Sequence, residues 1–306
     1  MIGPEENPLK GPERVRPSGR VAAAAAVLAD RGIESARADA ELLAAHVLGV
    51  PRGRLAVSSG FAPDQLDRYD RLVTRRGRRE PLQHLLGWAA FRRIELAVGP
   101  GVFVPRPETE LLAGWGIEQA RAAASDRRDR PVVVDLCAGS GAIALSVAHE
   151  VPSARVVAVE QARPALDWLR RNAAERAAAG DSPIEVVAAD VTAPGLLPEL
   201  TGQVDVLLCN PPYVPERVAV PPEVADHDPA EAVFAGDDGL AVIRPVIRRA
   251  GDLLRPGGAL GIEHDESHGE SVPALLRDDG RYVEIADHPD LAGRARFATA
   301  RRRHRR

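Results

Sequence analysis

The spacing of apolar residues along the chain changes near residue 87. Upstream, apolar positions recur three and four residues apart, which is the period of a helix with one buried face. This spacing predicts helices over Val21–Asp30, Ala36–Leu48 and Pro63–Arg78. Gly49 and Pro51 end the second helix, and a proline opens the third, because the fixed φ of proline suits a first helical turn. The pattern therefore predicts a small helical domain at the start of the chain.

Downstream of residue 131, short apolar runs alternate with helical segments. Runs rich in valine and leucine, interrupted by turn residues, are typical of buried strands. The predicted strands are Val132–Leu136, Val156–Glu160, Ile184–Ala188, Val204–Cys209, Ala259–Glu263, Tyr282–Ala286 and Arg296–Ala300. The predicted helices between them are Ala142–Glu150, Pro164–Ala179, Gly239–Leu254 and Ser267–Asp278. This alternation predicts an α/β fold with a parallel, doubly wound sheet.

A short hairpin is predicted between these two regions. Apolar residues alternate from Phe91 to Val98 and return at Val102–Val104, around Gly99-Pro100-Gly101. Glycine and proline between two alternating runs mark a turn. After Pro107 the pattern becomes helical again, to about residue 124. The expected segments are a disordered leader at 1–18, a helical domain at 19–86, a linker hairpin at 87–107, an α/β domain at 108–301 and a basic tail at 302–306.

Composition limits the class of protein. The chain has 306 residues, of which 45% are hydrophobic and 4% aromatic, so alanine, leucine and valine must fill a sizeable core. Its two cysteines, Cys137 and Cys209, are too few for a disulfide framework or a zinc site, which fits a reducing compartment. The N-terminal segment lacks the apolar core of a signal peptide, and no apolar run is long enough to span a membrane. We therefore expect a cytoplasmic protein with no metal and no membrane association.

The charge is unevenly distributed. The net charge is −4, and five of the last six residues are arginine, so the other 300 residues carry −9. An acidic body argues against a general nucleic-acid-binding surface, so no stable nucleic-acid binding is expected. The arginine-rich end is interpreted as a solvated tail in preference to a binding tail.

A glycine-rich turn follows the first predicted strand of the α/β region. It reads Asp135-Leu136-Cys137-Ala138-Gly139-Ser140-Gly141. Glycines at a strand-to-helix turn let a ligand approach the backbone closely. The acidic residue that opens the turn does not suit a phosphate, but it tolerates a cation such as the sulfonium of S-adenosylmethionine (AdoMet).

Two further acids follow at strand ends. Glu160 ends the second predicted strand, where a carboxylate can accept both ribose hydroxyls of a nucleoside, and Asp190 follows the third, within reach of an adenine edge. A structural turn or a helix cap would explain each acid by itself. Three successive strand ends that carry such residues predict a nucleoside site at one edge of the sheet.

A rigid polar turn follows the fourth predicted strand: Asn210-Pro211-Pro212-Tyr213. The prolines fix φ and remove two N–H donors, so the carbonyl groups stay free to accept hydrogen bonds. With the side-chain carbonyl of Asn210, they can hold both hydrogens of a planar NH2 group, and Tyr213 can lie against its face. Such a clamp would aim an amide or amine nitrogen at a methyl donor. A plain proline turn is the alternative.

These residues resemble a known family. Asp135–Leu145, Glu160 and Asn210–Tyr213 together are similar to class I AdoMet-dependent methyltransferases that modify amino or amide nitrogens. The whole pattern resembles the release-factor glutamine methyltransferases of the HemK/PrmC type. Additional matches are Pro81-Leu82-Gln83-His84-Leu85-Leu86-Gly87, Phe103-Val104-Pro105-Arg106-Pro107-Glu108-Thr109-Glu110, Asp228-Pro229, Ala232-Val233, Gly236, Gly239-Leu240 and Glu263-His264.

The resemblance implies a fold, a cofactor and a substrate. The fold is a Rossmann-like sheet, mostly parallel with an antiparallel last strand, and the substrate is the glutamine of the Gly-Gly-Gln loop of peptide-chain release factors. The implied partner would dock on the helical domain. The residues implied to hold AdoMet are Asp135, Cys137, Ala138, Gly139, Ser140, Gly141, Glu160, Asp190, Val191 and Asn210. Those implied to hold the glutamine are Asn210, Pro211, Pro212 and Tyr213, with Phe103, Arg106 and Pro107 at the border.

The chain departs from the family at two positions. Cys137 stands where the family has a glycine, so this position must accommodate a Cβ atom, and we interpret the side chain as packing. Val191 stands where an aromatic residue is common. Two other functions remain open: an adenine-N6 methyltransferase that acts on RNA or DNA, and a non-enzymatic partner protein with the AdoMet fold.

Overall fold

The computed structural model describes residues 14–126 and 130–304. The chain divides into two compact units, Met1–Gly87 and Trp88–Arg306, and each is described by itself. Most of the predicted leader, residues 1–13, lies outside the described residues. The last part of that segment is not a loose leader, because the backbone of Val15 pairs with Phe61 and the first helix begins at Pro17.

The first unit is helical. Its elements are α1 (Pro17–Asp30), α2 (Ala36–Leu48), the 3-10 helix η1 (Arg52–Val57), α3 (Pro63–Gly77) and the short α4 (Leu82–Leu86). α2 has the predicted bounds, and α4 was not predicted. Leu28, Leu43, Phe61 and Tyr69 form the centre of the unit, and each is fully buried. The Tyr69 hydroxyl donates to the carbonyl of Ala40 at 3.1 Å, so the buried polar group is satisfied.

The second unit begins with the hairpin β1 (Trp88–Phe91) and β2 (Ile94–Ala97). The prediction placed its turn at Gly99-Pro100-Gly101, and this was wrong: the turn lies at Arg92-Arg93, with φ of 52° at Arg92. Val102 and Val104 are buried without belonging to a strand, so their apolar character reflects packing and not strand pairing. Strand-like spacing alone could not distinguish the two.

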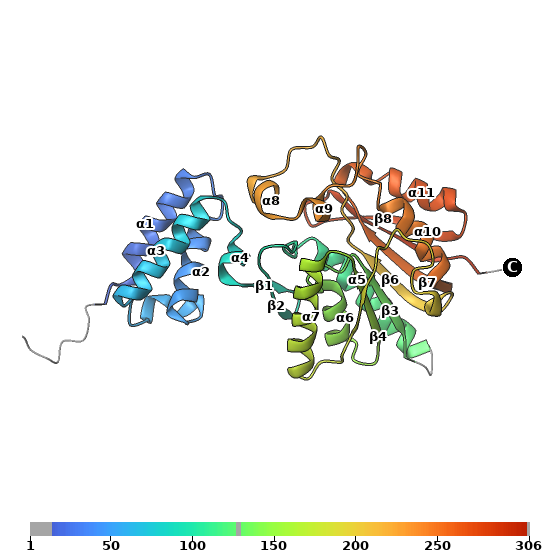
Figure 1. Cartoon of the computed structure of the whole chain (residues 1–306), viewed down its shortest axis with the longest axis horizontal. Helices are drawn as coiled ribbons and strands as arrows, with labels where there is room; N and C mark the ends of the chain where they lie inside the picture. Colours follow the sequence, from blue (N-terminus) through green and yellow to red (C-terminus); the bar gives the residue numbers. More distant parts are fainter. Residues whose placement is uncertain (1–13, 127–129, 305–306) are drawn as a thin grey trace, which may run out of the picture. The chain divides into compact units, whose positions relative to one another are not determined.

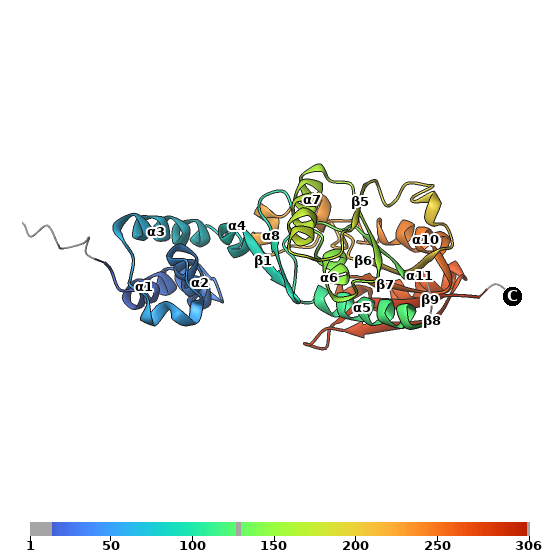
Figure 2. The same cartoon turned by 90° about the horizontal axis from the view of Figure 1, so that it is seen from below.

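A seven-stranded sheet organises the rest of the second unit. Its strands are β3 (Val132–Leu136), β4 (Arg155–Glu160), β5 (Glu185–Ala188), β6 (Val204–Cys209), β7 (Leu254–Glu263), β8 (Tyr282–Pro289) and β9 (Ala295–Arg302). The order is β5-β4-β3-β6-β7-β9-β8, with parallel pairs except where β9 runs against its two neighbours. This confirms the predicted mostly parallel sheet with an antiparallel last strand. Figure 2 shows β8 and β9 at one side of the sheet.

Helices cover both faces of this sheet (Figure 1). They are α5 (Thr109–Asp126), α6 (Ala142–Glu150), α7 (Arg163–Ala178), α10 (Ile243–Leu253) and α11 (Ser271–Asp279). One core packs α5, α6 and α7 against alternate residues of the strands, such as Val133, Val156 and Val206. The other packs α10 and α11 against residues of the opposite face, such as Val134 and Leu207. Burial on both faces explains why the central strands read as continuous apolar runs.

Short helices complete the second unit. They are η2 (Pro198–Leu200), α8 (Pro222–His227), α9 (Ala230–Val233) and η3 (Glu266–His268). None of them was predicted, because one or two helical turns are too short to show a helical period. α10 begins four residues later than predicted, after the turn that contains Asp238.

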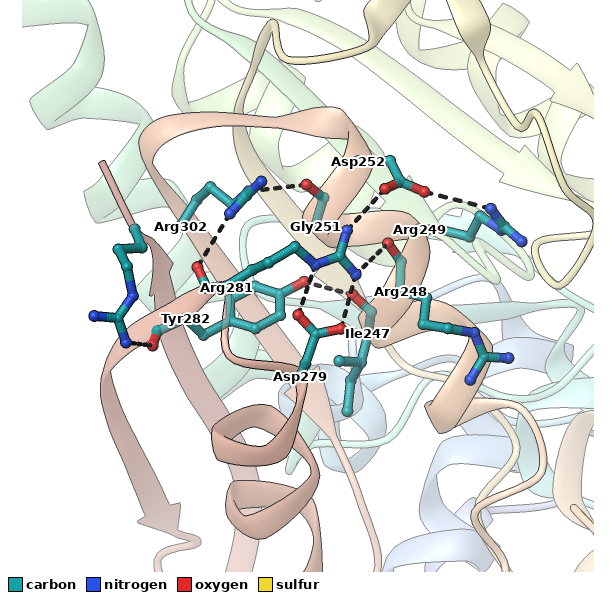
Figure 3. Close-up of polar contacts among 10 residues, drawn as sticks. Ile247, Arg248, Arg249, Gly251, Asp252, Asp279, Arg281, Tyr282 and Arg302 are labelled. Carbon is teal, nitrogen blue, oxygen red and sulfur yellow. Dashed lines mark hydrogen bonds and ion pairs between the residues drawn. The ribbon is translucent and has the colours of Figure 1, made fainter. Parts of the chain in front are cut away.

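The last described residues are tied to α10 and to the start of β8 (Figure 3). Arg281 donates to the carboxylates of Asp279 and Asp252 and to the carbonyl of Arg248. Arg302, the last residue of β9, donates to the carbonyl of Gly251 at 2.8 Å. The predicted solvated tail therefore loses its first residue to the sheet, while residues 305–306 lie outside the described part.

Within residues 14–126 and 130–304, no helix combines the length and apolar character that a membrane span requires.

Candidate functional site

A cavity of about 300 Å³ opens at the carboxyl ends of β3, β4 and β6. β3 is the point where the strand order reverses, and a doubly wound sheet leaves a crevice there. The volume falls at the lower end of the range of small-molecule sites. The predicted site residues that line it are Phe103, Arg106, Asp135, Cys137, Ala138, Gly139, Ser140, Glu160, Val191, Asn210, Pro211, Pro212 and Tyr213.

Asp135 places a carboxylate inside the protein at the end of β3. The backbone N–H of Ala144 in α6 donates to its Oδ2 at 3.0 Å. Its Oδ1 is buried, with no hydrogen-bond partner among residues 14–126 and 130–304. Burial, assisted by the nearby charge of Glu160, raises the pKa of Asp135 to about 8. A cation in the cavity would favour the ionised form, so the site is disposed towards a positively charged ligand.

Glu160, at the end of β4, holds the glycine-rich turn. Its Oε2 accepts from the backbone N–H of Gly139 at 2.9 Å, and its Oε1 accepts from those of Gln161 and Ala162 at 2.8 Å. A carboxylate offers about four acceptor positions, so three backbone donors leave little room for more. Glu160 therefore has a structural task in addition to its predicted contact with a ribose, which stays a prediction.

Cys137 adopts a backbone conformation that glycine normally provides. Its φ is 59°, in the left-handed region where a Cβ atom is unfavourable. Its side chain packs against the core cluster that contains Cys209. Burial, and then the neighbouring Cys137 thiol, raise the pKa of Cys209 well above its usual range. The side chain is therefore partly buried against this cluster and also lines the cavity, and its packing role stays a prediction.

Asn210-Pro211-Pro212-Tyr213 forms one wall of the cavity. β6 is buried along its whole length up to Cys209, so the chain leaves the sheet and enters the cavity at Asn210. The Asn210 side-chain amide donates through Nδ2 to the hydroxyl of Thr109 at 3.1 Å. The Tyr213 hydroxyl points to a buried partner in the interior of the second unit.

Tyr213 donates to the Oε1 atom of Glu263, the last residue of β7, at 3.1 Å. Burial raises the pKa of Tyr213 far above its usual value and the pKa of Glu263 to about 7. Tyr213 therefore remains a neutral hydrogen-bond donor at physiological pH, and its ring is held by a buried contact at the far end.

The segment with α8 and α9 contributes another wall. Val220, Val224, Pro229 and Val233 line the cavity. This segment is fastened to the chain before α5 by an ion pair between Arg106 and the fully buried Asp228 carboxylate, with Nη2 and Oδ2 2.6 Å apart.

Arg106 has a second contact, because its guanidinium lies over the ring of Phe103 at 4.7 Å from the ring centroid. This arrangement is a cation–π contact. Burial raises the pKa of Asp228, and the charge of Arg106 opposes this shift without cancelling it. The ion pair therefore offsets only part of the cost of burying the Asp228 carboxylate.

Three predicted site residues do not line the cavity. Asp190 is exposed, and its Oδ1 accepts from the backbone and hydroxyl groups of Thr192 at 2.8 and 2.7 Å. Pro107 is exposed beside Arg106. Gly141 precedes α6 with φ of 91°, and a Cβ atom there would lie 2.6 Å from the Leu169 side chain. Asp190 and Gly141 shape the turns of the site and do not form its walls.

Sequence reasoning missed Thr109, Pro105 and the walls from the α8–α9 segment. Thr109 appeared only as one letter of a motif. Its proximity to Asn210 depends on α5 crossing the end of β6, which no local pattern reveals.

The cavity fits AdoMet in two respects. The unpartnered Oδ1 of Asp135 offers an acceptor to a cationic ligand. Gly139, with φ of 55°, lines the cavity, and a Cβ atom there would meet no atom within 4 Å, so a side chain would occupy ligand space.

Two family models match the chain. The model described as PrmC N-terminal domain matches residues 21–87, and the one described as Methyltransferase small domain matches residues 122–227.

Curated relatives are similar over nearly the whole chain. The release factor glutamine methyltransferase of Mycolicibacterium smegmatis is 50% identical over 282 residues, which cover 92% of this chain and 96% of the relative. That of Streptomyces coelicolor is 49% identical over 284 residues, with 92% and 96% covered. A 4-amino-L-phenylalanine/4-methylamino-L-phenylalanine methyltransferase of Streptomyces pristinaespiralis is 41% identical over 258 residues, with 84% and 85% covered.

A solved structure supports the fold. The structure of the hMettl16 catalytic domain in complex with the MAT2A 3′UTR hairpin 6 has a TM-score of 0.51 and 14% identity, covering 69% of this chain and 76% of that chain. At this identity the similarity concerns the fold alone.

Proposed function

This chain belongs to the release factor glutamine methyltransferase family, and we propose that it methylates the side-chain amide nitrogen (N5) of the glutamine in the Gly-Gly-Gln motif of peptide-chain release factors. The observation that carries the proposal is a single cavity that joins the glycine-rich turn after β3 to the Asn210–Tyr213 wall. A methyl donor and a planar amide would meet there.

When bound, AdoMet supplies a methyl group activated by the adjacent sulfonium. Asp135, Cys137, Ala138, Gly139, Ser140, Glu160, Val191 and Asn210 would hold it, with Gly141 and Asp190 shaping the turns. The buried Asp135 would compensate the positive charge of the ligand, since burial strengthens the attraction between opposite charges.

The Asn210–Tyr213 wall would hold the substrate amide. Its nitrogen is a weak nucleophile because the lone pair is delocalised into the carbonyl. Hydrogen bonds from both N–H groups to the Asn210 side-chain carbonyl and a backbone carbonyl of the proline turn would draw electron density onto the nitrogen. With AdoMet bound, these residues would aim the nitrogen at the methyl carbon. S-adenosylhomocysteine would leave with the electron pair of the carbon–sulfur bond, and the proton lost by the nitrogen would pass to solvent. Positioning and preorganised acceptors supply the rate advantage.

Phe103, Arg106 and Pro107 would border the glutamine, since the first two line the cavity and Pro107 follows them in the chain. The helical unit, residues 19–86 in the predicted boundaries, would dock the release factor, and we place the reaction in the cytoplasm. Stable nucleic-acid binding is not part of the proposal, because the body of the chain is acidic.

Two other substrates are tested alongside. Adenine-N6 methylation shares the Asn-Pro-Pro-Tyr sequence. An aromatic amine is the second, because one 41% identical relative is named for a methyltransferase of 4-amino-L-phenylalanine. All three substrates present an NH2 group attached to a planar system, so the clamp alone does not distinguish them.

The test is incubation of the full chain with AdoMet and a purified release factor, followed by mass spectrometry of the Gly-Gly-Gln peptide. We expect the mass increase of one CH2 unit on the glutamine, and none after the change Asn210→Ala. Parallel reactions contain an RNA mixture or 4-amino-L-phenylalanine. If AdoMet binds but methyl transfer occurs only in one of those, or in none, the proposal is wrong; in the last case a binding role without catalysis would remain.

A further inference from the structure

The two polar side chains of the Asn210–Tyr213 wall have buried partners that the mechanism above does not use. Asn210 donates to Thr109, and Tyr213 donates to Glu263. Thr109 is the first residue of α5 and is 3% exposed, while Glu263 ends β7 and is 1% exposed. Both partners are therefore shielded from water, and a hydrogen bond in the protein interior fixes the orientation of a side chain more strongly than one in water.

The fold brings the two supporting residues to the same edge of the sheet. β6 and β7 are parallel neighbours with Cys209 opposite Ile262, so Asn210 and Glu263 follow side by side at the same edge. Thr109 begins α5, which packs against both β6 and β7. Thr109 thus holds Asn210 and Glu263 holds Tyr213, each through a buried hydrogen bond.

The hydrogen bond to Thr109 sets the direction of the Asn210 side chain. The Nδ2 atom of Asn210 donates to the Thr109 hydroxyl oxygen at 3.1 Å. The NH2 group of an amide can only donate, and its carbonyl oxygen can only accept. The NH2 group of Asn210 therefore faces Thr109, and its carbonyl oxygen Oδ1 points away from it.

We propose that Thr109 and Glu263 are positioning residues that fix the Asn210 amide with its carbonyl oxygen towards the substrate nitrogen and hold the Tyr213 ring against it. This inference rests on the proposed function. Without Thr109, the Asn210 amide could turn over and present NH2 to a substrate NH2 group, which would replace an acceptor with a repelling donor.

The central test replaces Thr109 by valine, which keeps the shape but removes the hydroxyl, and by serine, which keeps the hydroxyl. We expect Thr109→Val to lower kcat on a Gly-Gly-Gln peptide about 100-fold, the size of effect seen when a reacting group is misplaced or a preorganised hydrogen bond is lost. The affinity for AdoMet, measured by calorimetry, should change less than threefold. Thr109→Ser should recover at least a tenth of the wild-type kcat.

The matched control is Thr299→Val. Thr299 is also buried, at 5% exposure, and its hydroxyl lies 2.8 Å from His288 Nε2, outside the cavity lining. Loss of this hydroxyl should leave kcat and KM within twofold of the wild type. A comparable fall in kcat in both valine variants would assign the effect to general loss of a buried hydroxyl and would overturn the inference.

A second variant keeps the inference testable if the Thr109→Val protein does not fold. Glu263→Gln keeps the size of the side chain but can donate as well as accept, so the Tyr213 hydroxyl no longer has a fixed acceptor. We expect kcat to fall about tenfold with unchanged AdoMet binding. Unaltered kcat in Glu263→Gln and Thr109→Val would overturn the inference.

One readout does not depend on turnover. With 15N-labelled asparagine, the Asn210 side-chain NH2 signals should show slow hydrogen exchange in the wild type and faster exchange in Thr109→Val. If the wild-type chain does not methylate the peptide, the proposed function fails, whereas the exchange comparison still decides the positioning role. Equal exchange in the two proteins would contradict it.

Discussion

At the scale of single residues, the site depends on groups held in unfavourable states. Among the described residues, none partners the Oδ1 atom of Asp135, and Cys137 has the backbone conformation of a glycine. Both residues line the cavity, and unfavourable conformations or charge states persist at functional sites when they contribute to ligand binding. The effect of each residue can be measured.

The first prediction concerns the pH dependence of AdoMet binding. Burial raises the pKa of Asp135 to about 8, so the free protein carries a proton there at neutral pH. A cationic ligand favours the ionised form, so this proton must leave on binding. Affinity should therefore rise with pH up to about 8, by at most tenfold per pH unit, and level off above it.

Calorimetry from pH 6 to 9, in buffers of different ionisation enthalpy, measures both the affinity and the released proton. The control is Asp135→Asn, which can still accept from Ala144 but does not titrate; its affinity should be weaker at pH 9 and independent of pH. An equally steep profile in this variant would place the titration elsewhere.

The second prediction concerns Cys137. At a φ of 59°, glycine avoids the cost of about 1–2 kcal/mol that a Cβ atom meets in the left-handed region. The greater entropy of glycine in the unfolded chain offsets part of this advantage. Cys137→Gly should therefore be more stable than Cys137→Ala by about 1 kcal/mol. Urea unfolding at fixed pH measures the difference.

The comparison has a control on a regular helix. Ala174 lies exposed inside α7, where replacement by glycine should destabilise by about 1 kcal/mol. If glycine is also the poorer residue at position 137, the left-handed backbone there is not a source of strain.

At the scale of elements, the sheet was more predictable than the walls of the site. β3, β6, α2 and α6 have the predicted bounds: the two strands are nearly continuous apolar runs, and each helix begins or ends beside a glycine. The hairpin turn and the short helices α4, α8 and α9 were not found. Their sequences hold too few residues for a period, and tertiary contacts decide their conformation.

The third prediction concerns the ion pair that fastens the α8–α9 segment. Arg106→Gln leaves the buried Asp228 carboxylate without its charge partner, which should cost about 2 kcal/mol locally, less than a fully buried pair because Arg106 is one third exposed. Limited proteolysis should then cut within residues 214–235 more rapidly, and KM for the Gly-Gly-Gln peptide should rise.

Asp228→Asn added to Arg106→Gln removes the stranded charge and should restore part of the protection. The matched control is Arg217→Gln on the same segment, because the Arg217–Asp237 pair is 3.8 Å long and more than 80% exposed on both sides. Exposed pairs contribute little. Equal proteolysis of Arg106→Gln and Arg217→Gln would show that the Arg106–Asp228 pair does not hold the segment.

At the scale of the whole molecule, the chain folds as two compact units. Within the part of the chain that the structure describes, the residues that line the cavity all belong to the second unit. We propose that the second unit carries the chemistry and the first docks the release factor.

The fourth prediction separates these tasks. A chain that begins at Trp88 should bind AdoMet with unchanged affinity and methylate a short Gly-Gly-Gln peptide with a kcat near that of the full chain. On the intact release factor, its kcat/KM should fall at least tenfold, because docking contacts are lost. Circular dichroism and urea unfolding verify that the shortened chain is folded. Equal loss on peptide and on intact factor would contradict a docking role.

The sequence by itself determined the α/β class, the order of the strand and helix types, and the two motifs of the site. These features are local: a buried strand, a glycine-rich turn and a proline turn each follow from a few consecutive residues. The family resemblance used the same residues, and the relatives confirm it.

Only the tertiary structure decided which side chains support the motifs. Thr109 contacts Asn210 from 101 residues away, Glu263 contacts Tyr213 across 50, and Asp228 contacts Arg106 across 122. Such contacts depend on the order β5-β4-β3-β6-β7-β9-β8, which places β6 beside β7 and α5 across their ends. The distance between two residues along the sequence does not predict this strand order, because strand pairing is set by the packing of the whole sheet.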